Sequence, residues 1–518
     1  MGRLAIIRPM TIDADIGYQA LQAHDPRFDG RLFVGVTSTR IYCRPICRVR
    51  LPRRENCRFF ETAAQAEAAT FRPCMKCRPE IAPGPGLAWT AMDASRTLAT
   101  QAAHALDAQA ASGQAPDGEG SGAGNASLAA LALRIGVSDR HLRRIFAAEH
   151  GVTPIQYLHT RRLLLAKQLL TDTRMPITQV ALASGFRSLR RFNTAFADSY
   201  RMSPTRLRGE AARPLARGAA AVGVEAADAI GVTLAYRAPY DSAALLRFFD
   251  RRAIPGVETV VGERIRRTLR AGTVAPVAGW IEAEFPAPGS RVRIRFAPEL
   301  APHSGRVLAA VRRWLDLDAA PQAIDAALAG LPGAPGLRLP GSVDGFELAV
   351  RAVLGQQVTV AAARTLARRL IERFGTPIAT PWAGIDRVFA APEAIATTPL
   401  ERIAELGIIR SRAGAIVALG QAWPAIEPLL AARSQPQALI ERLQSLPGIG
   451  AWTAHYIAMR ALGWPDAFPP NDVALLKATG RLFDQPSQRA AEALSQAWRP
   501  WRSYAVLRLW NSLETPSP

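Results

Sequence analysis

All five cysteines of the 518-residue chain lie between positions 43 and 77. Three residues separate Cys43 from Cys47. Two residues separate Cys74 from Cys77, so four of the thiols form two close pairs, and such pairs suit tetrahedral zinc. Cys57 fits neither pair, and a long chain with no later cysteine is not a disulfide scaffold. The pattern predicts a small zinc domain, and on spacing alone a purely structural zinc ion is the simpler interpretation.

The chain is strongly basic. Its formal net charge of +21 and isoelectric point near 11.0 favour a polyanionic partner, for which nucleic acid is the default. The alternative explanation is a compositional bias toward arginine and alanine. No stretch of about 20 apolar residues indicates a membrane span, and the N-terminus lacks the apolar segment of a signal peptide. We therefore expect no membrane association and a reduced, cytoplasmic location close to the nucleoid.

Breaker-rich segments divide the chain. The run APGPG ends the cysteine region at residues 82–86, and residues 112–125 and 209–228 have the composition of linkers. Apolar spacing is helical from 127 to about 208, alternates as in strands over 230–300, and is again helical from 305 onward. We expect a multidomain, mainly α fold with a small four-cysteine zinc α/β domain (11–86), a double helix-turn-helix domain (90–210), a small α/β domain (230–315) and an all-helical helix-hairpin-helix domain (316–518).

Basic side chains crowd the cysteine pairs, which suits contact with phosphate. Four thiolates on one zinc ion also leave a net charge of about −2, and a sulfur in such a centre stays nucleophilic. The basic residues are Arg44, Arg48, Arg50, Arg53, Arg54, Arg72, Lys76 and Arg78.

Residues 25–80, with the pattern YCRPxC…FRPCxxCxP, closely resemble the N-terminal domain of the Ada response proteins. The resemblance implies one zinc ion held by four cysteines and the irreversible transfer of a methyl group from a DNA methylphosphotriester to Cys43. Methylation turns an anionic thiolate into a neutral thioether, so repulsion of the DNA backbone falls. The implied ligands are Cys43, Cys47, Cys74 and Cys77.

Two helix-turn-helix units are expected between residues 127 and 208. In each, a serine, Ser138 or Ser188, precedes a basic helix suited to a major groove. The pair resembles the double helix-turn-helix of AraC-type regulators, which follows the zinc domain in Ada proteins. An amphipathic bundle with a solvated basic face is the alternative. Expected DNA contacts are Arg140, His141, Arg143, Arg144, Arg187, Arg190 and Arg191, together with Arg50 in the zinc domain.

A second chemical signature lies in the C-terminal half. The sequence LPGIG at 446–450 predicts a hairpin in which Gly448 and Gly450 let the backbone approach DNA closely, and the next helix offers free N–H groups to phosphate. Asp472 precedes a helix, where its simplest role is an N-cap and where the helix dipole keeps it ionised. Residues 230–510 resemble the helix-hairpin-helix DNA glycosylases, and the AlkA 3-methyladenine glycosylases in particular.

The glycosylase resemblance implies that Asp472 is the catalytic carboxylate and that Gln357 stands where relatives carry an intercalating leucine. It places Trp452 where bifunctional relatives carry a Schiff-base lysine, so hydrolysis without strand cleavage is expected. The absence of cysteine after position 77 excludes the iron–sulfur cluster of some relatives, and a monovalent cation at the hairpin is a further expectation. Residues expected in the base pocket are Trp452, Tyr456 and Trp510, for which core packing is the alternative role.

We therefore expect a bifunctional alkylation-damage response protein. One half takes a methyl group onto a zinc-bound cysteine and regulates transcription, and the other removes alkylated purines such as 3-methyladenine. One alternative is a transcription regulator whose glycosylase-like half is catalytically idle, and another is a glycosylase whose front half is only structural. Expected partners are alkylated and promoter double-stranded DNA, with RNA polymerase as a further candidate, and the expected oligomeric state is a monomer.

Overall fold

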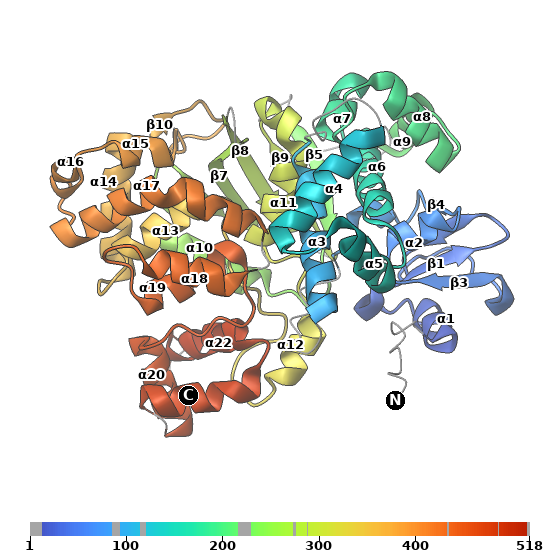
Figure 1. Ribbon diagram of the computed structural model, residues 1–518. Helices are drawn as coiled ribbons and strands as arrows, with labels where there is room; N and C mark the ends of the chain where they lie inside the picture. The colour runs from blue at the N-terminus through green and yellow to red at the C-terminus, as the bar shows by residue number, and fades with distance from the viewer. Residues whose placement is uncertain are drawn as a thin grey trace. The chain divides into compact units, whose positions relative to one another are not determined.

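The computed structural model describes residues 13–84, 94–113, 121–215, 229–272, 276–286, 289–432, 435–484 and 486–514 (Figure 1). The chain forms two compact units, Met1–Val222 and Gly223–Pro518. Unit 1 holds a small sheet followed by helices. Unit 2 holds a larger sheet followed by a helical domain. The predicted multidomain, mainly α fold is therefore confirmed.

The zinc-domain part of unit 1 is a four-stranded sheet with the order β3-β1-β2-β4. Strands β1, β2 and β3 pair antiparallel, whereas β2 and β4 are parallel, with Tyr42 opposite Pro73. This parallel register brings the residues that follow Tyr42 and Pro73 to the same edge of the sheet. The elements are α1 (Ala14–Gln22), β1 (Phe33–Val36), β2 (Ile41–Cys43), β3 (Cys57–Phe60), α2 (Ala63–Ala68) and β4 (Arg72–Pro73), with 3₁₀ helices at Pro26–Phe28, Arg54–Asn56 and Pro79–Ile81.

The rest of unit 1 is helical. The predicted caps are present, since Ser138 Oγ accepts from His141 N at 3.2 Å and Ser188 Oγ accepts from Arg191 N at 3.4 Å. The helices are α3 (Ala94–Ala111), α4 (Ser121–Ile135), α5 (Asp139–His150), α6 (Pro154–Asp172), α7 (Ile177–Ala183), α8 (Leu189–Tyr200) and α9 (Pro204–Leu215).

Both predicted linkers are too long. Helix α4 begins inside the first one at Ser121, and α9 continues into the second as far as Leu215. The second segment is rich in alanine, whose helix propensity offsets the glycines that suggested a loop. The remaining linker positions, 114–120 and 216–228, lie outside the described residues.

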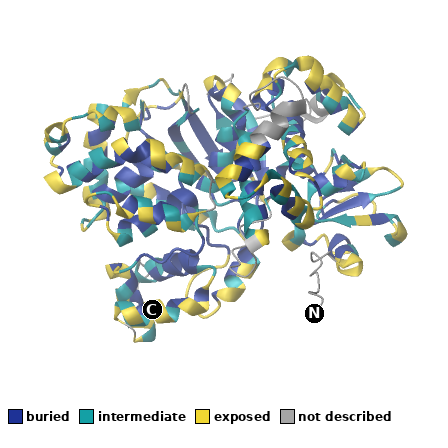
Figure 2. Ribbon diagram, in the orientation of Figure 1, coloured by how far each residue is buried: buried dark blue, intermediate teal, exposed yellow. Residues whose placement is uncertain are grey.

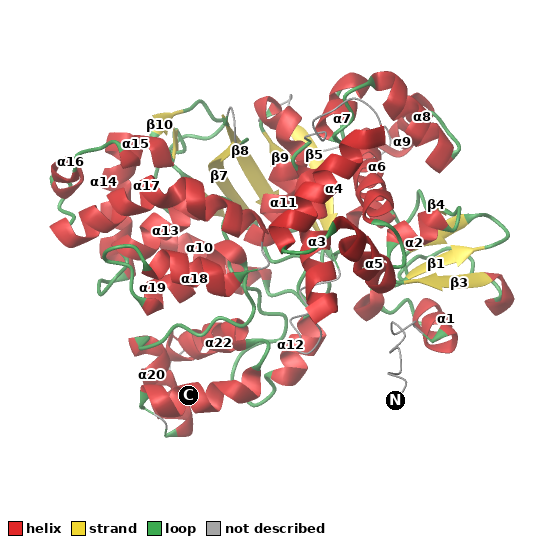
Figure 3. Cartoon of the chain, viewed as in Figure 1, coloured by secondary structure: helices red, strands yellow, loops and turns green. Residues whose placement is uncertain are grey.

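Unit 2 begins with a five-stranded antiparallel sheet of order β5-β9-β8-β7-β6 (Figure 3). The alternation predicted from the sequence is visible in β9, where Val292 and Ile294 are fully buried between exposed or half-buried arginines. Figure 2 shows β7 and β8 as largely buried strands. The elements are β5 (Ile230–Ala235), α10 (Ser242–Arg252), β6 (Glu258–Val261), β7 (Arg264–Ala271), β8 (Val277–Glu284), β9 (Arg291–Phe296), a 3₁₀ helix (Pro298–His303) and α11 (Ser304–Trp314).

The helical domain of unit 2 is built around α13 and α17. Among the described residues, α17 is the one helix long and apolar enough to cross a membrane. Its Ile416, Leu419 and Ile426 are fully buried in the domain core, which accounts for its composition. The elements are α12 (Pro321–Ala327), α13 (Gly345–Leu354), α14 (Val360–Phe374), β10 (Thr376–Pro377), β11 (Arg387–Val388), α15 (Pro392–Ala396), α16 (Leu400–Ala404), α17 (Arg410–Ala432), α18 (Pro436–Gln444), α19 (Ala451–Ile457), a π-helical turn (Ala458–Leu462), α20 (Val473–Phe483), α21 (Gln488–Ser495), a 3₁₀ helix (Gln496–Trp498) and α22 (Arg502–Glu514).

Candidate functional site

The two cysteine pairs converge on one point. Cys43 ends β2 and Cys74 follows β4, and the parallel pairing is extended by a 2.9 Å hydrogen bond from Cys74 N to Tyr42 O. The four Sγ atoms lie within 4.8 Å of one another, and all four residues are buried. Four converging thiols fit a single tetrahedral zinc ion. They are Cys43, Cys47, Cys74 and Cys77. Cys57 lies apart, in the small core beneath α1.

Two arginines expected to meet phosphate have other partners. Arg44 is 2% exposed, donates from Nε to Asp29 Oδ1 at 2.7 Å, and donates from its backbone N–H to Cys77 Sγ at 3.3 Å. Arg78 pairs with Glu80 at 2.9 Å and with a second carboxylate. Both therefore stabilise the zinc domain and do not present a free charge to DNA. The exposed basic residues of the cluster are Arg48, Arg50, Arg53 and Lys76.

Within unit 1, a buried polar seam joins the zinc domain to α6. Lys167 Nζ lies 2.5 Å from Glu80 Oε2, with both side chains at most 1% exposed. Glu67, on α2, accepts from Thr160 Oγ1 at 3.0 Å and from Tyr42 Oη at 3.1 Å. Burial raises the pKa of Glu67 to about 7, although both hydroxyl donors oppose the rise. The sequence alone did not reveal this seam.

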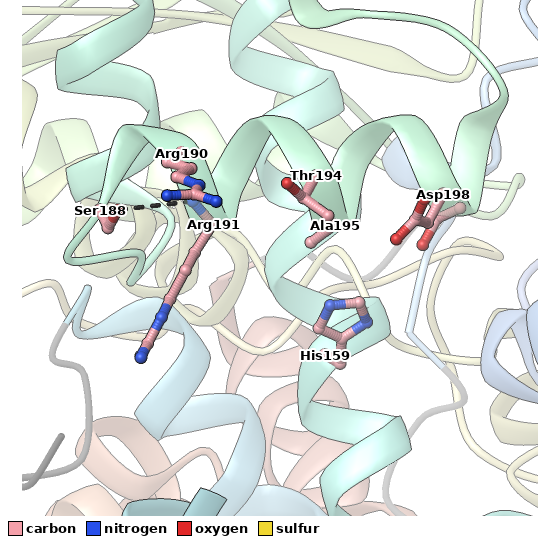
Figure 4. Close-up of a pocket in the computed structure, with 8 residues that line it drawn as sticks. His159, Ser188, Arg190, Arg191, Thr194, Ala195 and Asp198 are labelled. Carbon is pink, nitrogen blue, oxygen red and sulfur yellow. Dashed lines mark hydrogen bonds between the residues drawn. The ribbon is translucent and has the colours of Figure 1, made fainter. Parts of the chain in front are cut away.

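The two basic helices that were predicted to enter a major groove, α5 and α8, carry basic side chains. On α8, Arg187 precedes the helix and Arg190 and Arg191 are exposed on it. Helix α8 borders an open pocket of about 530 Å³, and Arg190, Arg191 and His159 of α6 line it (Figure 4).

On α5, Arg140 and Arg144 are exposed, and Arg144 Nη2 lies 3.3 Å from His141 Nδ1. Arg143 is committed to an ion pair of 3.0 Å with Asp139 one turn earlier, which makes it the least available of the predicted contacts.

The predicted hairpin joins α18 to α19. Gly448 has φ of +78°, and a Cβ there would lie 2.9 Å from Ala415 Cβ, so glycine is required for the turn and for the close packing. Gly450 is the N-cap residue of α19, whose first N–H groups lack helical partners.

Gln356, which the sequence did not single out, donates from Nε2 to Gly448 O and Thr453 Oγ1, both at 3.0 Å. The next residue, Gln357, is exposed with φ of +51°.

Asp472 occupies the N-cap position that the sequence predicted for it. As the N-cap of α20, its Oδ1 accepts from Leu475 N at 2.6 Å. Its oxygens also accept from Trp452 Nε1 at 2.6 Å and from Trp510 Nε1 at 3.1 Å, and the residue is only 7% exposed. Three hydrogen bonds thus hold one buried carboxylate in a fixed orientation.

The three predicted aromatic residues gather around this carboxylate. The rings of Trp452 and Tyr456 are stacked, with centroids 5.1 Å apart and an interplanar angle of 12°. Trp510 lies 6.2 Å from Tyr456. All three are half-buried, and Tyr456 and Trp510 also pack against the hydrophobic cores of the helical domain. Arg460, a buried residue not singled out from the sequence, donates from Nη1 to Tyr456 Oη at 2.7 Å.

Four family models match the chain along its length. The metal binding domain of Ada matches residues 17–80, and a helix-turn-helix domain matches 131–210. The AlkA N-terminal domain matches residues 231–344, and the HhH-GPD superfamily of base excision DNA repair proteins matches 350–503. The first match and the thiol cluster together identify the metal as zinc, and the others make DNA the partner of the protein.

Relatives cover all or part of the chain. The "Probable bifunctional transcriptional activator/DNA repair enzyme AlkA" of Mycobacterium tuberculosis is 36% identical over 508 residues, which are 96% of both chains. The "DNA-3-methyladenine glycosylase 2" of Escherichia coli is 36% identical over 54% of this chain and 96% of its own. The E. coli "Bifunctional transcriptional activator/DNA repair enzyme Ada" is 35% identical over 27% of this chain and 34% of its own. The chain therefore belongs to the family of bifunctional transcriptional activators and DNA repair enzymes that join an Ada-type metal-binding domain to an AlkA-type glycosylase.

Proposed function

We propose that unit 1 accepts a methyl group from DNA methylphosphotriesters on Cys43 and that unit 2 hydrolyses the N-glycosidic bond of alkylated purines such as 3-methyladenine. The observation that carries the second activity is the buried carboxylate of Asp472, which receives two indole N–H groups from half-buried rings. The name of the E. coli glycosylase supports the second activity, and the names of the other two relatives support DNA repair and transcription activation.

The methyl transfer needs one ionised sulfur. Bound zinc would keep the four cysteine sulfurs deprotonated at neutral pH. The Cys43 sulfur attacks the methyl carbon, so an S–C bond forms, the C–O bond breaks, and the phosphodiester anion leaves with the electron pair. The product is a thioether, and the site carries about one negative charge less. DNA affinity rises as a result, and the exposed arginines of α5 and α8 then hold promoter DNA for transcription activation.

The base excision needs a fixed anion beside the sugar. Once the damaged nucleotide is flipped, the rings of Trp452, Tyr456 and Trp510 receive the base. Asp472 stabilises the positive charge that develops on the sugar as the base departs with the bonding electrons, and it orients the water that attacks. Because position 452 is a tryptophan and not an amine, no Schiff base forms and the strand stays intact. Gly448 and Gly450 would hold the DNA backbone, Gln357 would enter the stack, and hairpin carbonyls would bind a monovalent cation.

One experiment tests both activities in the same tube. The full-length protein is incubated with a methylated duplex, and both the protein mass and the free bases are measured. We expect wild-type protein to gain one methyl group on Cys43 and to release alkylated purines. Cys43→Ser should lose only the protein methylation, and Asp472→Asn should lose only the base release, so each variant is the control for the other. Unchanged release by Asp472→Asn would overturn the catalytic role of Asp472, and no release by wild-type protein would leave unit 2 as a DNA-binding module. We further propose that the protein acts as a monomer and recruits RNA polymerase.

A further inference from the structure

The walls of the base pocket hold few uncommitted hydrogen-bond donors. The indole N–H groups of Trp452 and Trp510 both point to the oxygens of Asp472. An indole nitrogen donates one hydrogen bond and accepts none, so neither ring has capacity left for the edge of a base. Of the three aromatic side chains, only Tyr456 carries a polar group whose proton is not used by Asp472.

Arg460 fixes the role of the Tyr456 hydroxyl. Its guanidinium is held by hydrogen bonds from Nε to Pro340 O at 2.8 Å and from Nη2 to Gly341 O at 3.4 Å. It also lies 4.8 Å from the ring of Phe248, and it is 6% exposed. A guanidinium only donates, so the 2.7 Å contact makes Tyr456 Oη the acceptor. The phenolic proton must then point to another partner.

In the described parts of the chain, Arg460 is the hydrogen-bond partner found for Tyr456 Oη. The stacking of Tyr456 on Trp452 fixes the ring plane, so the hydroxyl proton has a defined direction. Burial alone would raise the pKa of a phenol, but nearby guanidiniums, that of Arg460 foremost, lower the pKa of Tyr456 below its ordinary value. A more acidic phenol is a stronger donor.

We propose that Tyr456, oriented by Arg460, reads the flipped base by donating a hydrogen bond, so that the pocket favours alkylated purines that present a carbonyl oxygen over those that present an amino group at the same position. An amino group would set a donor against a donor in a buried site, whereas a carbonyl would pair. Tyr456 is thus a specificity-determining residue and Arg460 is its positioning residue. The inference rests on the proposed glycosylase activity and adds a preference within it.

The test uses 7-methylhypoxanthine and 7-methyladenine, which differ in this group and in the proton on N1, each placed in the same duplex. Single-turnover excision rates are divided by the uncatalysed release rate of each base, which removes the difference in leaving-group reactivity. We expect wild-type protein to favour the carbonyl base by about tenfold, the size of one well-formed hydrogen bond. Tyr456→Phe should remove most of this preference through slower excision of the carbonyl base, with binding of a duplex carrying an abasic site unchanged.

A second protein keeps the Arg460 contact and changes only the donor strength. Replacement of Tyr456 by 3-fluorotyrosine makes the phenol more acidic and should increase the preference for the carbonyl base. If Tyr456→Phe does not fold, the fluorotyrosine protein still tests the proposed donor role of Tyr456. An unchanged ratio in either folded protein would overturn the inference while leaving the glycosylase assignment intact. Failure of wild-type protein to release either base would instead overturn the proposed glycosylase function, and this inference with it.

Discussion

Trp452 Nε1 donates a 2.6 Å hydrogen bond to Asp472 Oδ2, across a sequence separation of 20 residues. The ring that we propose as a wall of the base pocket therefore also orients the proposed catalytic carboxylate. Trp510 does the same from the C-terminal helix α22, to the other carboxylate oxygen at 3.1 Å. In the proposed mechanism, base binding and bond cleavage therefore depend on the same side chains, so a substitution in the pocket wall should also slow the chemical step.

Replacing Trp452 with phenylalanine tests this coupling. Trp452→Phe keeps an aromatic ring for stacking on Tyr456 but removes the donor to Asp472. We expect the excision rate to fall about 10- to 100-fold through misorientation of the carboxylate, with little change in KM. The matched control is Trp423→Phe, which alters a core indole packed on Phe346. A loss of excision rate of equal size in both variants would show that the effect is general loosening of the fold.

The two roles of Asp472 are separable by substitution. Asp472→Asn keeps a side-chain oxygen for Leu475 N, so α20 stays capped, but it removes the negative charge. We expect excision slower by at least about 100-fold. Stability should fall by about 1–3 kcal/mol, because the amide nitrogen would meet the Trp452 N–H in a buried site. Asp472→Ala loses the cap as well and should cost about 1 kcal/mol of stability in addition. Thermal unfolding and single-turnover excision of both variants measure the two effects; equal stability of the two variants would contradict the capping role.

Metal removal should affect the two units differently. The zinc domain has only small apolar clusters beside its four thiols, whereas unit 2 has two extended cores of its own. Structural zinc sites stabilise small domains directly. We therefore expect chelation to unfold the zinc domain and abolish protein methylation while base excision continues. Limited proteolysis and the two activity assays follow this, with restored methylation on adding zinc as the control. Loss of excision on chelation would show that the units are coupled.

Local features were the predictable part of the structure. The spacing of the thiols predicted that they would converge, and they do. Ser138, Ser188 and Asp472 were expected at helix starts, and each caps a helix as expected. The helix caps depend on neighbours within a few residues. The thiol cluster depends on the spacing of four cysteines in a short segment, which is specific enough to predict a metal-binding fold.

Features formed between distant segments were not predictable. Lys167 meets Glu80 across 87 residues, and Thr160 meets Glu67 across 93. A single sequence shows neither pairing, because a charged residue on a helix is by default assigned to solvent. Arg44 shows the converse error, since its place in an arginine-rich run suggested phosphate, whereas its side chain is buried against Asp29. Arg460 was missed because a charged residue in a helical segment is by default assigned to solvent.

The seam between the zinc domain and α6 contains the most unusual acid of unit 1. Glu67 is buried and receives hydrogen bonds from Tyr42 and Thr160, and Lys167 and Tyr200 also act on it electrostatically. Burial raises its pKa from 4.5 to about 7. Tyr42 directly precedes the proposed methyl acceptor, so this carboxyl links the strand of Cys43 to the helix-turn-helix part.

The raised pKa makes a signed prediction for stability. A carboxyl whose pKa is higher in the folded than in the unfolded state favours folding when protonated, so its contribution is complete below pH 4.5 and is lost as the pH rises through about 7. The loss should approach about 3 kcal/mol. Glu67→Gln mimics the protonated form, so its stability relative to wild type should grow between pH 5 and 8. The difference in unfolding between the two proteins cancels pH effects on zinc affinity, and Glu372→Gln, in an exposed pair, is the control. A difference independent of pH would contradict the buried, proton-binding state of Glu67.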